Sequence, residues 1–261
     1  MQFGPATRIF IANVGANAAH IGAGLQSPRF GDGRFEFVTI PEVKELRNSN
    51  SPYLLRYSDL RCYNRPDESL TRYLAPRVHS WPTHYDPEFE KFSYGDECEK
   101  TPRAAALKQM RPGDLLFFLA RLADYDEAAN RFTGQAGFYL IGFLEIAQIM
   151  AGIRAAPENE ELSHNAHFRR ARAYPALFYD GFYIFKGSSR SQRFQIARFF
   201  GRPEAERFLR DKAGQAWHWK TGRSDLQTIG SYTRACRCVL DPARSNAEAE
   251  RTAAFLEWLS Y

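Results

Sequence analysis

The amino-acid sequence predicts an α+β fold with a mixed, largely antiparallel sheet and peripheral helices. Two long apolar runs, at 111–122 and 137–149, are separated by a polar loop and indicate neighbouring antiparallel strands. Shorter strand patterns lie near both ends of the chain, at 8–14 and 233–240, and a helical pattern covers 247–259. Because strands of both halves mix with helices that lie outside them, the α+β class is favoured.

The first elements are a strand and a polar loop. RIFIANV, at 8–14, has the length of a covered strand, and FEFVTIPE, at 35–42, alternates as a second strand does. A helical turn is predicted at 43–50. The stretch up to Tyr94 contains five prolines, which prevent long helices, and many aromatic residues, which predict a packed covering segment.

The later elements alternate between strands and helices. TPRAAALKQM, at 101–110, predicts a short helix with proline in its first turn, and a loop at 124–135 would connect the two apolar strands. A short strand is predicted at 182–185. Helices are predicted at 190–200 and 203–212, and Ser245 is the expected N-cap of the last helix.

Length and composition exclude several protein classes. A chain of 261 residues can bury a full core, and we expect one domain over 1–261. Hydrophobic residues at 44% and aromatic residues at 15% exclude general disorder, and no stretch approaches the roughly 20 apolar residues of a membrane span. The N-terminus lacks the pattern of a signal peptide, so we expect a cytoplasmic protein with no membrane contact. The four cysteines are predicted to be reduced thiols: Cys62, Cys98, Cys236 and Cys238.

Positive charge is concentrated in one part of the chain. Residues 151–223 contain 14 Lys and Arg against 7 Asp and Glu, an excess larger than the net charge of +5 of the whole chain. Such a segment is typical of a surface that contacts phosphate, although proteins without a nucleic-acid partner also have basic surfaces. A nucleotide or nucleic acid is therefore the expected partner. No pattern nominates a cofactor or an oligomeric state.

The loop between the first two predicted strands holds candidate site residues. Asn13 and Asn17 offer amide donors and acceptors, and His20 can exchange a proton near neutral pH. Asp32 and Glu36, together with Glu42, could act as bases or cation ligands. The alternative is structural, because Asn and Asp beside glycine stabilise turns. No cysteine or serine has the spacing of a catalytic nucleophile.

KGSSRS, at 186–191, is a candidate anion site. A glycine after a strand, a following helix N-terminus, two serine hydroxyls and two cations are the groups that hold phosphate. The expected ligands are Lys186, Ser188, Ser189 and Arg190. The segment lacks the spacing of a Walker loop, and the alternative is a serine cap with surface cations.

HNAHFRR, at 164–170, places two histidines on one face of a predicted helix. A metal is not expected, because catalytic zinc needs a third protein ligand and no residue of the sequence is nominated for that role. Instead, Asn165 would read a base edge through its amide, while His167 or Arg169 contacts phosphate. The alternative is a polar helix end with solvated cations.

Two segments resemble known families. NVGANAAHIGAGLQSPRFGDGRFEFVTIPE, at 13–42, resembles the third nucleotide modification associated domain family of bacteria and phages. PGDLLFFLARL with GFYLIGFLEI resembles the small β-barrels of the PUA and EVE type, which accept bases and modified bases. The first resemblance implies a setting in DNA modification or phage-related systems, and the second makes a PUA-like barrel an alternative to the open sheet.

These observations lead to three functional hypotheses. The first is binding or handling of a nucleotide or modified base, in a pocket formed by the loop at 13–36 and aromatic residues of the central strands, Phe117, Phe118, Tyr139 and Phe143. The second is an enzyme that modifies a nucleotide or nucleobase, with His20 and Asp32 or Glu36 in acid–base roles. The third is a partner-binding subunit without a ligand of its own.

Overall fold

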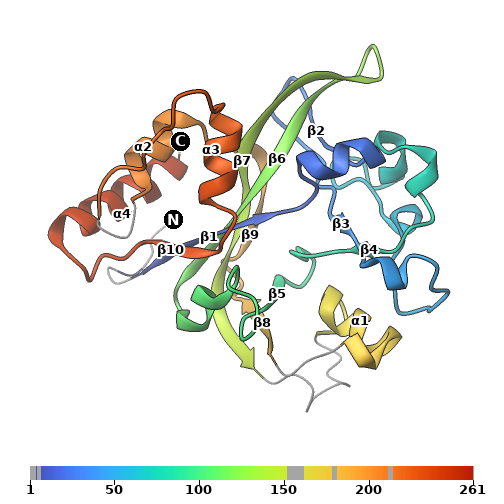
Figure 1. Cartoon of the computed structure of the whole chain (residues 1–261), viewed down its shortest axis with the longest axis horizontal. Coiled ribbons are helices and arrows are strands. Elements are labelled where there is room, and N and C mark those ends of the chain that lie inside the picture. Colours follow the sequence, from blue (N-terminus) through green and yellow to red (C-terminus); the bar gives the residue numbers. More distant parts are fainter. Residues whose placement is uncertain (1–3, 5–6, 152–161, 178–180, 211–213, 261) are drawn as a thin grey trace.

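The computed structural model describes residues 4, 7–151, 162–177, 181–210 and 214–260. Its centre is an eight-stranded mixed sheet in the order β10-β1-β6-β7-β8-β5, with β2 added beside β6 and β9 beside β7 (Figure 1). A separate two-stranded sheet pairs β3 with β4. The α+β prediction is confirmed, and the large sheet is open rather than closed into a PUA-like barrel.

The strands have these bounds: β1 Ile9–Val14, β2 Ser27–Arg29, β3 Ile40–Pro41, β4 Thr83–His84, β5 Ser93–Glu97, β6 Leu115–Asp126, β7 Arg131–Ala151, β8 Phe182–Gly187, β9 Gln192–Phe199 and β10 Arg237–Leu240. The α-helices are α1 Ala166–Ala173, α2 Arg202–Phe208, α3 Asp225–Tyr232 and α4 Asn246–Leu259. The 3₁₀ helices are η1 Ala18–Ala23, η2 Lys44–Leu46, η3 Tyr57–Asp59, η4 Leu70–Tyr73, η5 Pro76–Val78, η6 Ala105–Gln109 and η9 Pro175–Leu177.

The hairpin of β6 and β7 organises the sheet. Its strands pair antiparallel from Leu115–Glu145 to Asp126–Arg131, so the loop between them is shorter than the predicted 124–135. β1 runs parallel to β6 and pairs with β10 on its other edge. Because side chains of a strand alternate between faces, β6 contributes Phe118 to one core cluster and Phe117 to the other.

Each face of the sheet has its own cover. Helices α2, α3 and α4, in orange and red in Figure 1, cover the face of Phe117 with Phe208, Ile229 and Phe255. The long segment before β5 packs a third cluster around Tyr57, as the aromatic composition predicted. Among the described helices, none combines the length and apolar character that crossing a bilayer requires.

Residues 192–199 form a strand, so the predicted helix at 190–200 is wrong. β9 pairs antiparallel with β7, with Tyr139 opposite Phe199. Phe194, Ile196 and Phe199 are residue types that fit a pleated surface, and pairing with β7 outweighs the weak helical pattern. The serine-rich turn at 188–191 therefore leads into a strand and has no helix N-terminus behind it.

The predicted strand FEFVTIPE is also largely wrong. Only Ile40–Pro41 belongs to a strand, and Phe35, Glu36 and Val38 are all buried, so the expected alternation between a buried and an exposed face is absent. β2, at 27–29, lies within the predicted loop, and the predicted α-helix at 101–110 is replaced by a 3₁₀ helix over Ala105–Gln109. α3 was not predicted. α2 ends at Phe208, and residues 211 and 212 of the predicted helix lie outside the described residues.

Several predictions are confirmed. Strands occur at 9–14, 115–126, 131–151, 182–187 and 237–240, and a helical turn occurs at 44–46. The hydroxyl of Ser245 caps α4 by accepting a hydrogen bond from the Glu248 N–H. The four cysteines are free thiols.

Candidate functional site: a cavity between the N-terminal loop and helix α1

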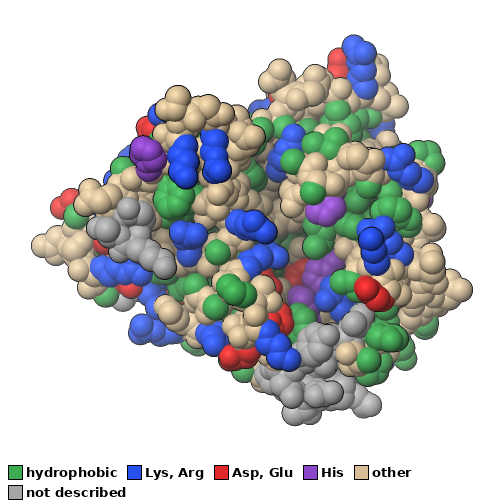
Figure 2. Space-filling view, in the orientation of Figure 1, with side chains coloured by type: hydrophobic (Ala, Val, Ile, Leu, Met, Phe, Trp, Pro, Cys, Tyr) green, Lys and Arg blue, Asp and Glu red, His purple; other side chains and the backbone are tan. Residues whose placement is uncertain are grey.

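A cavity of about 940 Å³ opens beside the N-terminal loop, between η1, β5, α1 and α3. Its size is near the upper end of about 300–1,000 Å³, the range of pockets that hold small ligands. Figure 2 shows this hollow, with histidine and acidic side chains deep inside it and Lys and Arg side chains toward its rim. Its polar lining includes Asn13, Asn17, His20, His84, Asp86, Asp96, Arg103, Arg121, His167, Arg170 and Arg234.

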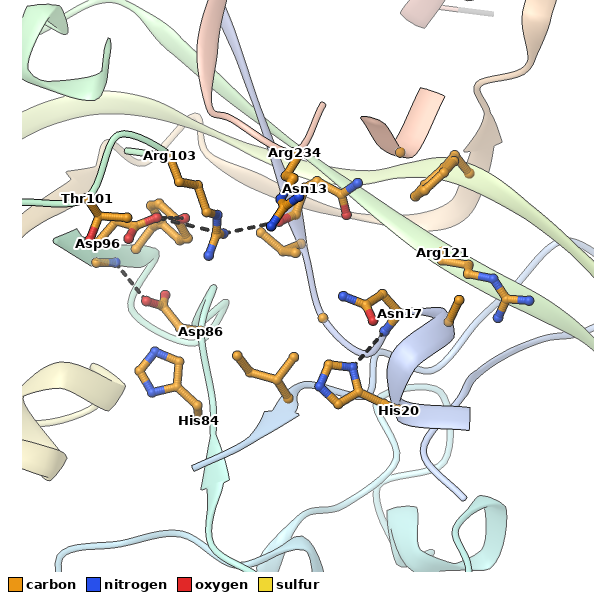
Figure 3. A pocket seen from close by; sticks show the side chains of 18 of the residues that line it. Asn13, Asn17, His20, His84, Asp86, Asp96, Thr101, Arg103, Arg121 and Arg234 are labelled. Carbon is orange, nitrogen blue, oxygen red and sulfur yellow. Dashed lines mark hydrogen bonds and ion pairs between the residues drawn. The ribbon is translucent and has the colours of Figure 1, made fainter. Parts of the chain in front are cut away.

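The N-terminal loop places its candidate residues Asn13, Asn17 and His20 in the cavity wall (Figure 3). The Asn13 amide donates to the Thr233 hydroxyl at 2.9 Å. The Asn17 side chain caps η1, and the Asn17 N–H donates to Nδ1 of His20 at 3.1 Å. Gly15 permits this turn, because it has a φ of +76° and an added Cβ would lie 2.5 Å from the Phe37 ring.

His20 is held as a neutral imidazole. Nδ1 accepts the Asn17 hydrogen bond, which places the ring proton on Nε2 in the neutral form. Burial, followed by the charge of Arg47, lowers the pKa of His20 below its ordinary value. The side chain can therefore donate from Nε2 to a ligand near neutral pH.

Four arginines reach the cavity, and two of them have no acidic partner in the described part of the chain. Arg103 lies 3.7 Å from an Asp96 oxygen and donates to the Asn13 carbonyl, and Arg170 is paired with Glu42. For Arg121 and Arg234, the described residues provide neither an ion pair nor a hydrogen bond. Arg121 is half-buried, and desolvation lowers its pKa, so an anion in the cavity would stabilise its charge.

A histidine–aspartate cluster forms one end of the cavity. His84 ends β4, Asp86 follows two residues later, and His167 lies in the first turn of α1. One potential ligand atom from each residue lies within 4.8 Å of the others, and Nε2 of His167 is 3.4 Å from an Asp86 oxygen. The two imidazole rings meet edge to face at a centroid distance of 4.6 Å. We call this group the His–Asp cluster.

Glu42 fixes the orientation of His84. Its carboxylate is 2.9 Å from Nδ1 of His84 and 2.8 Å from the Arg170 guanidinium. Burial would raise the pKa of Glu42, but His84 and Arg170 outweigh it and lower the pKa to about 2. The Arg170 guanidinium also lies 3.0 Å from Nδ1 of His84, so this nitrogen is held between Glu42 and Arg170, whereas Nε2 has no hydrogen-bond partner among the described residues.

His167 and Asp86 are buried with incomplete hydrogen bonding. The Gly95 N–H donates to one Asp86 oxygen at 2.8 Å, whereas the other oxygen and both ring nitrogens of His167 have no hydrogen-bond partner among the described residues. Desolvation lowers the pKa of His167 well below its ordinary value and raises that of Asp86. A buried polar group left unpaired costs roughly 1–3 kcal/mol, so these atoms are suited to an additional partner.

Asp32 and Glu36, the predicted acid–base residues, lie outside the cavity. Asp32 is exposed and bonds Arg34 within a turn. Glu36 is buried, and its oxygens accept hydrogen bonds from the N–H groups of Tyr63 and Asn64 at 2.7 and 2.8 Å. In these positions, both carboxylates stabilise local structure.

The segment at 186–190 also lies outside the cavity lining, with Lys186, Ser188, Ser189 and Arg190. The Arg190 guanidinium is paired with the buried carboxylate of Glu145, and the Ser188 hydroxyl donates to the same carboxylate at 2.5 Å. These interactions engage Ser188 and Arg190 with Glu145, and the expected helix dipole is absent because β9 follows the turn.

Asn165 and Arg169 flank His167 but do not line the cavity. Asn165 is fully buried as the N-cap of α1, where its side-chain oxygen accepts from the His167 N–H and its amide donates to Ser93. Arg169 donates to the His164 carbonyl. The aromatic residues expected beside a base, Phe117, Phe118 and Phe143, are buried in the core clusters, and Tyr139 packs there too.

Sequence reasoning missed most of the cavity's charged residues. His84 and Asp86 stand in the irregular proline-rich stretch, where neither helical nor strand periodicity draws attention to them. Arg121 did leave a signal, because an arginine inside an otherwise apolar strand is costly to bury without a reason. Arg103 and Arg234 occupy loops that are far apart in the sequence, and only the fold brings them together (Figure 3).

Comparison with known proteins supports the family resemblance. No curated protein and no solved structure shows significant similarity to the chain. The family model described as nucleotide modification associated domain 3 matches residues 8–241, which include β1, the whole cavity and β10. The chain therefore belongs to the nucleotide modification associated domain 3 family.

Proposed function

We propose that this protein binds a nucleotide, or a modified base within a nucleic acid, in the cavity beside the N-terminal loop. The observation that carries the proposal is the pair of arginines, Arg121 and Arg234, that reach the cavity without an acidic partner among the described residues. Guanidinium groups bind phosphate through several parallel hydrogen bonds, and a half-buried site strengthens that attraction.

The remaining polar groups of the wall suit the other parts of a nucleotide. Asn17 and the Nε2–H of His20 offer hydrogen bonds of the kind that base edges accept and donate. The membership in a nucleotide modification family supports the same class of ligand. An enzyme acting on a nucleotide or base stays the second candidate, favoured by the His–Asp cluster at the end of the cavity.

The test is nucleotide affinity in matched arginine variants. Arg121→Ala should weaken binding of nucleoside phosphates and short single strands by roughly tenfold or more for every base, because it removes a charge-assisted phosphate contact. Arg131→Ala is the control, since Arg131 lies on the same hairpin, is exposed and does not line the cavity.

Calorimetric titration at low salt measures both affinities. An equal loss of nucleotide affinity in Arg121→Ala and Arg131→Ala would contradict the proposal that the cavity binds the phosphate. An absence of binding by the wild type to DNA, RNA and nucleotides would remove the proposed function and favour a partner-binding subunit.

A further inference from the structure

We infer that the His–Asp cluster, His84, Asp86 and His167, binds a divalent transition-metal ion at the end of the cavity. The three side chains come from two distant parts of the chain, and their nearest ligand atoms lie within 4.8 Å of one another. Metal–ligand bonds of about 2.0–2.2 Å to imidazole and carboxylate are reached from this arrangement by side-chain shifts below about 1 Å.

The strongest observation is a set of buried polar atoms that lack partners. The side chains of His167 and Asp86 are 6% and 2% exposed, yet both ring nitrogens of His167 and one oxygen of Asp86 have no hydrogen-bond partner among the described residues. A structural ion pair would satisfy these atoms with each other. The 3.4 Å contact joins Nε2 of His167 to the Asp86 oxygen that already accepts from the Gly95 N–H, and it is not a hydrogen bond, whereas one cation could accept electron pairs from both side chains.

The surroundings of the cluster fit those of a metal site. Nδ1 of His84 is held between Glu42 and Arg170, so Nε2 is the ring nitrogen that remains available as a ligand. A carboxylate that orients a ligating histidine in this way is a recurring feature of metal sites. The Gly95 N–H holds Asp86, and the N-cap of α1 holds His167, so each ligand has its own support.

The chemistry of the ligands selects the class of metal. Two imidazole nitrogens and one carboxylate favour ions such as Zn²⁺, Co²⁺ or Fe²⁺ over Mg²⁺ and Ca²⁺, which prefer oxygen ligands. Three protein ligands leave at least one coordination position open. The cluster lines the cavity, so that position is accessible to water or, resting on the proposed function, to an oxygen atom of a bound nucleotide.

Metal binding can be measured without any nucleotide. The full chain, stripped with a chelator and titrated with Co²⁺, should bind one equivalent and develop a visible ligand-field absorption band, and Zn²⁺ should displace it. His84→Ala and Asp86→Asn should each weaken Co²⁺ binding by at least a hundredfold. Glu42→Gln should weaken it by about 10–100-fold, because it alters the support of His84 without removing a ligand.

His164→Ala is the matched control, because His164 is on the same segment as His167, pairs with Glu90 and is not part of the cluster. It should retain full stoichiometry and an unchanged spectrum. Circular dichroism must show each variant folded. If a variant is not folded, thermal unfolding of the wild type tests the metal site instead. The midpoint temperature of the wild type should rise when Zn²⁺ is added and should not rise when Mg²⁺ is added.

The two proposals fail separately. A wild type that binds no Co²⁺ or Zn²⁺ stoichiometrically, or a His84→Ala variant that binds Co²⁺ as the wild type does, would overturn the metal site. Nucleotide binding that persists in such a protein would leave the proposed function intact. Stoichiometric Co²⁺ binding without nucleotide binding would support the metal site while removing the proposed function.

Discussion

At the scale of single residues, His20 combines a structural and a functional position. Its Nδ1 accepts the Asn17 N–H at the start of η1, and the ring lines the cavity. If the loop binds a base without chemistry, His20→Ala should change nucleotide affinity or base preference, and the wild type should show no turnover. If His20 is a general acid or base, turnover should fall by about 10²–10⁴ instead. Titration and product assays on the same variant separate the two roles.

The lowered pKa of His20 also gives its contribution to stability a pH dependence. The unfolded chain protonates this histidine near pH 6.5, whereas the folded protein does so only at lower pH. Between those values the unfolded state binds more protons, so the contribution of His20 to stability decreases as the pH falls through about 6.5.

The comparison with His20→Gln isolates this effect from the other histidines. The free energy of unfolding of the wild type, minus that of His20→Gln, should increase as the pH rises from 5 to 7.5. Urea denaturation at each pH measures it. If the unfolding free energies of the wild type and His20→Gln differ by a constant amount over this pH range, His20 has the same pKa in the folded and unfolded states.

Glu36 illustrates what residue types alone reveal. An Asp or Glu in a glycine-rich loop is compatible with catalysis and with turn formation, and the sequence left both possibilities open. In the fold, the Glu36 carboxylate accepts hydrogen bonds from the backbone N–H groups of Tyr63 and Asn64. Asn17 and His20, from the same loop, line the cavity instead. The Glu36 contacts span about 27 residues in sequence, so local pattern could not distinguish them.

Glu36→Gln should therefore act on stability. The NH₂ group of the glutamine amide would face a backbone N–H, so two donors would meet and one charge-assisted hydrogen bond would be lost. Such a loss costs about 1.5–3 kcal/mol of unfolding free energy. Chemical denaturation measures the loss. Nucleotide affinity, measured where the variant is fully folded, should be unchanged, and a loss of turnover at unchanged stability would instead support the catalytic role.

At the scale of elements, the contact between α1 and β5 determines the geometry of the His–Asp cluster. Gly95 of β5 lies beneath the His167 ring, and an added Cβ would be 2.2 Å from its Cδ2 atom. Gly95→Ala should displace the ring, lower stability by about 1–3 kcal/mol through overpacking, and weaken Co²⁺ binding.

Gly113→Ala is a useful comparison for that variant. Gly113 has open space around an added Cβ but a φ of +89°, so its substitution strains the backbone without touching the cluster. It should lower stability and leave Co²⁺ affinity as in the wild type. Weakened Co²⁺ binding in both variants would indicate general destabilisation rather than displacement of His167.

Elements differ in how well the sequence predicts them. β6 and β7 were predictable because each is a long apolar run, and α4 was predictable because Ser245 and the helical pattern agree. β9 was not, since its sequence also has a weak helical pattern, and it is pairing with β7 that makes the segment a strand. β2 and β3, with three and two residues, are too short to produce a periodic signal.

At the scale of the whole molecule, charge and cavity make separate contributions to binding. Affinity should fall as salt rises, by about 0.7 in log K per unit of log salt for each phosphate of a single strand that is contacted. If the cavity provides all the contacts, a mononucleotide and a short oligonucleotide should have similar, shallow slopes of about −1 to −3.

A steeper slope for the oligonucleotide would indicate that the basic segment at 151–223 adds phosphate contacts outside the cavity. Titrations of both ligands at several salt concentrations decide between a free nucleotide and a polymer as target. Affinity that does not respond to salt would contradict the phosphate contacts altogether.

The candidate site as a whole was only half predictable. The sequence identified the N-terminal loop, because its polar and glycine residues exceed what a connection needs, and it identified His167. It could not identify Asp86, Arg103 or Arg234. Each stands in an irregular segment without a motif, and only the fold brings these residues into one cavity wall.

The position of β1 has a consequence for synthesis on the ribosome. This strand is made early, yet its parallel partner begins at Leu115 and its antiparallel partner at Arg237. At about 5–20 residues per second, an apolar segment waits on the order of tens of seconds before both of its neighbours exist. Nascent chains stalled before residue 237 should therefore be better substrates for chaperones, and more prone to precipitate, than the finished protein.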